Sequence, residues 1–359
     1  MLGEKVASLL ITMNNLPDYD QYVVAWFVNV ATHQLLNMSI YELVGAVQTH
    51  KAEILEELYR KATDFIKKLA DIFKKEDICS LEPPIPLTPN DRTELFNPCK
   101  ALEFLSDASR GKIYRFPLQP ALSFEFAEYV RTYMPTLKTS TLKREVVAVT
   151  SEVLALLVLG AYASRVYVVE GEYGYTFIGT YNPRIADIEK LNTMARMITK
   201  AVVGGDGSRI ALLVGLASAT VLNVGKYLFE VDGRTFYSSI RIVRTGNKTM
   251  LKAYETIDLT DLSQTIMRLQ VASAIYNLVS NYPSRDLSKT NKYARTARSV
   301  IEELARAIYK YYLYEDPAEL YRALRTATTR TTLSDLVSYL TSKGRNASDI
   351  INELLNVRV

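Results

Sequence analysis

Hydrophobic residues recur at helical spacing in the first part of the chain. Over residues 20–77, apolar side chains follow one another at intervals of about three and four residues, with Glu and Lys between them. A proline-rich stretch, residues 82–89, comes next, with Pro98 beyond it, and proline interrupts helices and favours extended backbone. This pattern predicts an N-terminal helical region over residues 1–77 and a linker or crossing loop over residues 78–98.

The next hydrophobic segments change from long apolar runs to short ones. The run 146–163 predicts a buried helix, and the run 210–224 predicts a second buried element rather than a membrane span. Two short apolar segments with glycine between them predict a β-hairpin over residues 166–178. A further helix is expected over residues 184–202, ending at the glycine cluster 204–207.

Alternation of apolar and polar residues is clearest over residues 226–255. Turn signals at Asp232-Gly233 and around Gly246 divide this region into a three-stranded antiparallel meander. Helical periodicity returns from Leu259 onward and predicts a helical C-terminal bundle. The fold class we expect is therefore α+β, mainly helical, with a β-hairpin and the meander in a middle domain. The expected domains are 1–77, 99–258 and 259–359, with 78–98 between the first two.

The chain has few of the residues that hold metals or act as nucleophiles. Among its 359 residues are only two cysteines, Cys79 and Cys99, and two histidines, His33 and His50. A Cys/His zinc site, an iron–sulfur cluster or a disulfide framework needs more ligands or bridges than these. Histidine acid–base chemistry has few candidates as well. We therefore expect no metal, no cofactor and no enzymatic activity.

Charge is distributed unevenly along the chain. Residues 1–105 carry 10 Lys and Arg against 15 Asp and Glu, whereas residues 106–359 carry 33 against 24, so a net charge of +4 combines −5 with +9. A basic body favours an anionic partner such as nucleic acid. The many charged residues and 24 tyrosines are typical of a thermophile. No signal peptide is visible at the start, so we expect a cytoplasmic protein without membrane contact.

Basic residues gather in three sets in the second part of the chain. Cations that follow a phosphate backbone, beside aromatic rings on which bases stack, are what nucleic-acid binding requires. The alternative for each set is a solvated protein face. The candidate nucleic-acid-binding residues are Arg110, Lys112 and Arg115 in the first set, Lys226, Arg234, Tyr237, Arg241, Arg244, Lys248 and Lys252 in the second, and Lys292, Arg295 and Arg298 in the third.

Other motifs favour simpler interpretations. The cluster 204–207 lacks the Gly-Lys-Ser/Thr of a phosphate-binding loop and the second acid of a polymerase-type Gly-Gly-Asp-Asp turn, so we interpret it as a helix stop and tight turn. A metal-dependent nuclease remains an alternative if acids such as Glu170, Glu230 and Asp232 converge in the fold. A purely structural protein-interaction subunit is another alternative.

An acidic helical start, a proline-rich crossing, Tyr-rich hairpins such as Glu172-Tyr173-Gly174-Tyr175 and a long helical C-terminal region occur together in this chain. In these features the sequence resembles the large subunit of the archaeal subtype I-A CRISPR interference complex (archaeal Cascade). The resemblance implies a non-catalytic subunit that binds crRNA and target DNA together with other CRISPR effector subunits. It also implies a role in recognising the protospacer-adjacent motif and in recruiting the helicase–nuclease. No family residue maps onto a particular position here.

Overall fold

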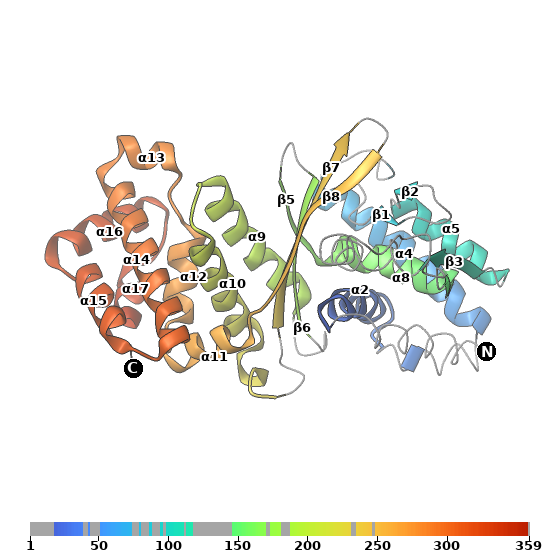
Figure 1. Ribbon diagram of the computed structural model, residues 1–359, viewed down its shortest axis with the longest axis horizontal. Coiled ribbons are helices and arrows are strands. Elements are labelled where there is room, and N and C mark those ends of the chain that lie inside the picture. The colour runs from blue at the N-terminus through green and yellow to red at the C-terminus, as the bar shows by residue number, and fades with distance from the viewer. Residues whose placement is uncertain are drawn as a thin grey trace, which may run out of the picture. The chain divides into compact units, whose positions relative to one another are not determined.

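A computed structural model describes most of the helices and strands of the chain (Figure 1). The described residues are 18–38, 42–43, 51–73, 79, 86–87, 94–95, 98–110, 113–117, 146–169, 173–180, 187–230, 235–245 and 248–357. The chain folds into two compact units. Unit 1 comprises Met1–Gly179 and Ser238–Thr256, and unit 2 comprises Thr180–Tyr237 and Ile257–Val359. The mainly helical character predicted from the sequence is confirmed.

Four helices form the core of unit 1 among the residues that the structure describes. These are α2 (Asp18–Leu36), α4 (Lys51–Phe73), α5 (Pro98–Ser109) and α8 (Ser151–Ser164). Helix α8 packs against α2 and α5, and all but one of its residues are buried, because it is apolar on every side. At Gly160 any side chain would overlap the backbone carbonyl of Phe27. The absence of a side chain at Gly160 therefore allows α2 and α8 to approach closely.

Two small antiparallel sheets lie in the described part of unit 1. Strand β1 (Pro86–Leu87) pairs with β2 (Glu94–Leu95), and β3 (Ile113–Pro117) pairs with β4 (Val146–Thr150). The sequence predicts helix from Val146, but the structure begins α8 only at Ser151. The first five residues, Val-Val-Ala-Val-Thr, are mostly β-branched, which favours strand over helix.

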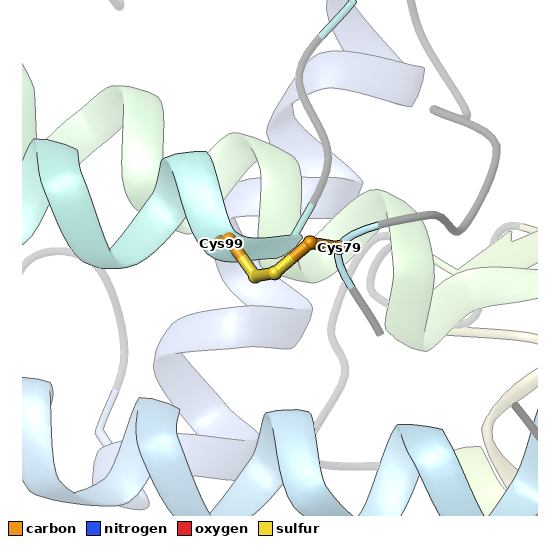
Figure 2. Close-up of a disulfide and its surroundings, with 2 residues drawn as sticks. All are labelled: Cys79 and Cys99. Atoms are coloured by element: carbon orange, nitrogen blue, oxygen red, sulfur yellow. A yellow bond between two sulfur atoms is a disulfide. The ribbon is translucent and has the colours of Figure 1, made fainter. Parts of the chain in front are cut away.

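A disulfide joins Cys79 to Cys99 in unit 1 (Figure 2). Cys99 is the second residue of α5, and Cys79 is exposed in the segment that follows α4. The two cysteines are 20 residues apart, and the proline-rich stretch 82–89 lies between them. Two cysteines are too few for a disulfide framework, as expected, but they suffice for one bridge, which the sequence interpretation did not foresee.

Four strands form the largest sheet, in the order β5-β6-β7-β8. They are β5 (Arg165–Val169), β6 (Tyr173–Thr180), β7 (Thr235–Thr245) and β8 (Lys248–Asp258). The antiparallel pairing of β5 with β6 confirms the predicted hairpin. The predicted meander is wrong in its first strand, because Gly225–Tyr227 forms a short 3₁₀-helix, η3, and β7 is instead hydrogen-bonded to β6.

The error in the meander has a clear physical cause. Alternation around Tyr227 and Phe229 suggested that these rings point to one buried face. In the structure Leu228, between them, is buried, while Phe229 is 57% exposed. The carbonyl of Leu228 accepts a hydrogen bond of 2.6 Å from the Gln264 side chain, which holds the segment as a turn against helix α11 (Thr260–Arg268).

Unit 2 is a bundle of helices, coloured from green to red in Figure 1. Its helices are α9 (Ile188–Gly204), α10 (Arg209–Val224), α11 (Thr260–Arg268), α12 (Ala272–Ser280), α13 (Arg285–Thr290), α14 (Lys292–Tyr314), α15 (Pro317–Ala327), α16 (Arg330–Ser342) and α17 (Ala347–Leu355). Helix α10 packs against α9, α11, α12 and α14 and is largely buried, as predicted for residues 210–224. With η3 it is the one described helix, Arg209–Tyr227, that is long and apolar enough to span a membrane.

The division into units differs from the predicted domains. Residues 1–77 and helix α5 lie in the same unit, whereas the helices between residues 187 and 224 belong with the C-terminal helices. Strand β7 begins in unit 2 and continues into unit 1. Strand β8 begins in unit 1 and ends in unit 2. Sequence periodicity identifies helices but does not show which of them share a core.

Candidate nucleic-acid interface

Two cation–aromatic pairs lie at the junction of η3 and α11 in unit 2. The Lys226 ammonium lies 4.6 Å from the ring centroid of Tyr227, and the Arg268 guanidinium lies 5.7 Å from that of Phe229. Lys226, Phe229 and Arg268 are all exposed. We call these four residues the η3–α11 surface. Such a surface offers positive charge to phosphates and π-faces to bases.

The backbone around the η3–α11 surface is held from both sides. Helix α10 ends at Val224, and the chain then tightens into η3, whose final turn includes a hydrogen bond from the Leu228 N–H to the Gly225 carbonyl, 3.1 Å. On the other side, Arg268 is the last residue of α11, which contacts η3. The buried side chain of Leu228 and the hydrogen bond that its carbonyl accepts from Gln264 fix the turn, which leaves Tyr227 half-buried and the Phe229 ring exposed.

Electrostatics keep the Lys226 ammonium charged. A hydrogen bond with Tyr227, together with the charges of the Tyr227 oxygen and Glu230, raises the pKa of Lys226. The ammonium is therefore protonated at physiological pH. Lys226 is itself exposed, and it lies beside the half-buried ring of Tyr227.

Four predicted residues lie on neighbouring strands of unit 1. Arg241 and Arg244 are in β7, and Lys248 and Lys252 are in β8, which is hydrogen-bonded to β7. The predicted turn between the two strands, at residues 246–247, lies outside the described residues. The pairing of the strands brings the four backbone positions into one hairpin, as expected from the sequence.

The third predicted set, on α14, is engaged within the protein. Lys292 forms an ion pair of 3.2 Å with Asp335 of α16. Arg295 donates to the carbonyls of Ser288 and Lys289, 3.1 and 3.0 Å, at the C-terminal end of α13. Because these contacts hold helices together, the set has a structural role that the spacing of its charges did not reveal.

Arg298 has the most extensive interactions of this set. Its guanidinium donates to the carbonyls of Gly205, 2.7 Å, and Asp206, 2.5 Å, and lies over the ring of Tyr282. The turn between α9 and α10 is thus tied to α14. This confirms that the cluster 204–207 is a helix stop and tight turn.

The carboxylate of Glu302 also joins α14 to the turn between α9 and α10. Glu302 accepts from the Ser208 N–H, 3.0 Å, and from the hydroxyl of Tyr282, 2.5 Å. Burial alone raises the pKa of Glu302, but the hydrogen bonds from Ser208 and Tyr282 and the charge of Arg298 outweigh it, so the pKa is lowered. Burial, with the Glu302 carboxylate as acceptor, raises the pKa of Tyr282. The proton therefore stays on the tyrosine.

The remaining predicted residues are placed as follows. Tyr237 is buried, at 7% exposure, and offers no free ring to a base. Arg110 is exposed in the turn after α5, with Asp107 3.9 Å away. Arg115 lies in β3. Lys112 and Arg234 lie outside the described residues.

The acids of the nuclease alternative are not brought together by the described residues. Glu170 and Asp232 lie outside them, and Glu230 is exposed in the turn after η3. Asp258, at the end of β8, accepts from the Thr260 N–H at the start of α11, 2.8 Å. Within the described part of the chain no group of three or more His, Cys, Asp or Glu residues is arranged to hold a metal ion.

Sequence reasoning missed Phe229 and Arg268 of the η3–α11 surface. Alternation places Phe229 in a strand, and Arg268 lies 39 residues further along the chain in a helix. The one available signal was the breakdown of alternation at Leu228. Comparison of the chain with protein-family models, with curated proteins and with solved structures gives no match.

Proposed function

We propose that the chain is a non-catalytic, nucleic-acid-binding subunit of a CRISPR type I-A effector complex. Its partners would be crRNA, target DNA, the other effector subunits and the helicase–nuclease, in the cytoplasm. The assignment to this complex rests on the resemblance of the sequence. In the structure, the observation that supports nucleic-acid binding is the η3–α11 surface.

The η3–α11 surface supplies both kinds of contact that single strands need. Lys226 and Arg268 would neutralise phosphates, and each neutralised phosphate releases counterions. Tyr227 and Phe229 would stack on bases, and the Arg268 guanidinium adds a second planar surface. The basic strand positions of β7 and β8 in unit 1 would supply a separate phosphate contact.

Removal of the surface charges tests this assignment. We expect Lys226→Ala with Arg268→Ala to weaken binding of a fluorescent single-stranded RNA or DNA by about 10-fold, measured by anisotropy. Lys190→Ala with Lys200→Ala, two exposed lysines of α9, is the matched control and should bind like wild type. If both variants and wild type bind the single strand with equal affinity, the η3–α11 surface is not the nucleic-acid interface.

The hairpin is tested separately. Arg241→Glu, Arg244→Glu and Lys248→Glu together should weaken DNA binding while the thermal stability of the protein stays close to wild type, because charges that serve a nucleic-acid partner contribute little to the fold. Unchanged DNA binding would remove these positions from the interface.

The assembly is tested by purifying the tagged chain from its native host. RNA that co-purifies is sequenced, and protein partners are identified by mass spectrometry. Recovery of repeat-derived RNAs with other CRISPR proteins supports the proposed complex. A preparation without either would overturn the CRISPR assignment and leave nucleic-acid binding to be judged by the variants above.

A further inference from the structure

The outward face of α15 carries long side chains without polar partners in the described chain. Ala318, Tyr321, Arg322 and Arg325 recur at helical spacing, and all four are exposed. Tyr321 is 54% exposed. No ion pair or hydrogen bond joins the side chains of Tyr321, Arg322 or Arg325 to another described residue. The opposite face of the helix is buried through Leu320, Ala323 and Ala327.

The charges on this face follow a fixed order along the helix. Glu315 and Asp316, both exposed, stand at its N-terminal end, and Asp316 also accepts from the Ala318 N–H, 3.0 Å, as the N-cap. The carboxylate of Glu319 is already paired with Lys310, 2.6 Å. Arg322 and Arg325 follow toward the C-terminal end. The face is therefore acidic at one end and basic at the other.

This order decides which kind of partner fits. A nucleic-acid backbone is negative along its whole length, so it would be repelled at Glu315 and Asp316. An antiparallel copy of the same helix presents the same charges in reverse order. Each acidic end then meets a basic end, and a two-fold axis repeats the contact.

We propose that α15 of one chain packs antiparallel against α15 of a second copy. With the two-fold axis between Tyr321 and Arg322, each Tyr321 ring faces Arg322 of the other copy, a cation–π arrangement that occurs twice. Ala318, a small residue, faces the long side chain of Arg325. Arg325 then lies near the acidic end formed by Glu315 and Asp316.

The contact is small, which determines how it must be measured. One helix face buries less than the roughly 800 Å² per partner of a standard interface. Leu313 and Tyr314, 49% and 72% exposed at the end of α14, add apolar area beside the acidic end. We therefore expect a weak, reversible dimer that forms as the protein concentration rises. The proposal is independent of nucleic-acid binding.

Complementary charge variants of the full chain test the contact. The acidic variant carries Arg322→Glu and Arg325→Glu, so both ends of the face become negative. The basic variant carries Glu315→Lys and Asp316→Asn, where Asn keeps a side-chain oxygen for the N-cap. A control with the same charge change as the acidic variant, Lys190→Glu with Lys200→Glu, alters α9 instead. Circular dichroism establishes that each variant is folded.

Sedimentation velocity at low salt, with nuclease-treated protein, gives the result. The apparent mass of wild type and of the control should rise from 40.5 kDa toward twice that value as the protein concentration increases. The apparent mass of each charge variant alone should stay at 40.5 kDa. An equimolar mixture of the two variants should dimerise again, because each charged end then meets an end of opposite charge, although one of the two Tyr321–Arg322 contacts is lost. A monomeric wild type at the highest concentration, dimeric single variants, or a mixture that stays monomeric would each overturn the proposal.

Discussion

At the residue scale, the best-defined part of the molecule is the turn between α9 and α10. Asp206 adopts a left-handed backbone conformation, φ 54°, and Gly207 lies so close to Tyr282 that an added Cβ would be 2.9 Å from its ring. Arg298 and Glu302 then satisfy the carbonyls and the N–H group that the turn exposes. Arg298, one of the residues predicted to bind nucleic acid, thus makes contacts that stabilise the fold.

Removal of the Arg298 guanidinium, which donates to two carbonyls of the turn, should destabilise unit 2. Arg298→Ala leaves the carbonyls of Gly205 and Asp206 without their donor, at a cost of about 1–3 kcal/mol. Arg298→Lys should recover only part of this, because an ammonium lacks the planar fork. Urea unfolding measures the free energy of unfolding of Arg298→Ala and of Arg298→Lys. Arg306→Ala, an exposed arginine on the same helix, is the control, and an Arg298→Ala variant as stable as the control would contradict the structural role.

The lowered pKa of Glu302 predicts a dependence of stability on acid pH. A carboxyl whose folded-state pKa lies below its unfolded value contributes stability above the unfolded pKa and loses it as pH falls through the folded pKa. We expect Glu302→Gln to remove part of the fall in melting temperature that wild type shows between about pH 5 and pH 3. Parallel melting curves for wild type and Glu302→Gln across this range would show that the carboxylate is not linked to folding.

At the element scale, apolar periodicity and turn residues predicted most helices and the hairpin β5–β6. Side-chain caps mark two of these helix starts: Asp316, before Pro317, caps α15, and Asn346 caps α17. The failures are local. β-branched residues at Val146–Thr150 form a strand where an apolar run suggested helix, and η3 replaces a strand because Leu228, not its neighbours, is buried.

The approach of α2 to α8 predicts a strong effect of a single methyl group. Gly160→Ala places a Cβ within the backbone of Phe27, so the two helices must separate, at a cost of at least about 1–3 kcal/mol. Gly204→Ala is the matched control, since nothing lies within 4 Å of the added Cβ. In thermal unfolding the melting temperature of Gly160→Ala should lie well below that of Gly204→Ala. Equal melting temperatures would contradict the close packing of α2 and α8.

The disulfide predicts a redox-dependent stability. Closing a segment of 20 residues restricts the unfolded chain and stabilises the fold by about 3 kcal/mol. Calorimetry should therefore show a lower melting temperature in reducing agent for wild type. The variant Cys79→Ser with Cys99→Ser should already melt lower and not respond to the reductant. A wild-type protein with two free thiols by chemical titration would contradict the bridge.

At the scale of the whole molecule, charge asymmetry pointed to an anionic partner, but not to the residues that would bind it. Phe229 and Arg268 lie close together only because α11 packs against η3. Arg295 can donate to the Ser288 carbonyl only because the C-terminal end of α13 lies beside α14. Neither follows from spacing along the chain. Among the residues predicted from the sequence, Lys226 is exposed and lies beside Tyr227, whereas Arg295 and Arg298 contact carbonyls within the fold.

The measurement that tests nucleic-acid binding most directly is the salt dependence of affinity for a single strand. Because bound phosphates release counterions, log Kd should rise linearly with log salt concentration for wild type. In Lys226→Ala with Arg268→Ala the slope should fall by about 1.4, or about 0.7 for each lost contact. No binding by wild type, or a slope that is unchanged in the variant, would contradict the proposed interface.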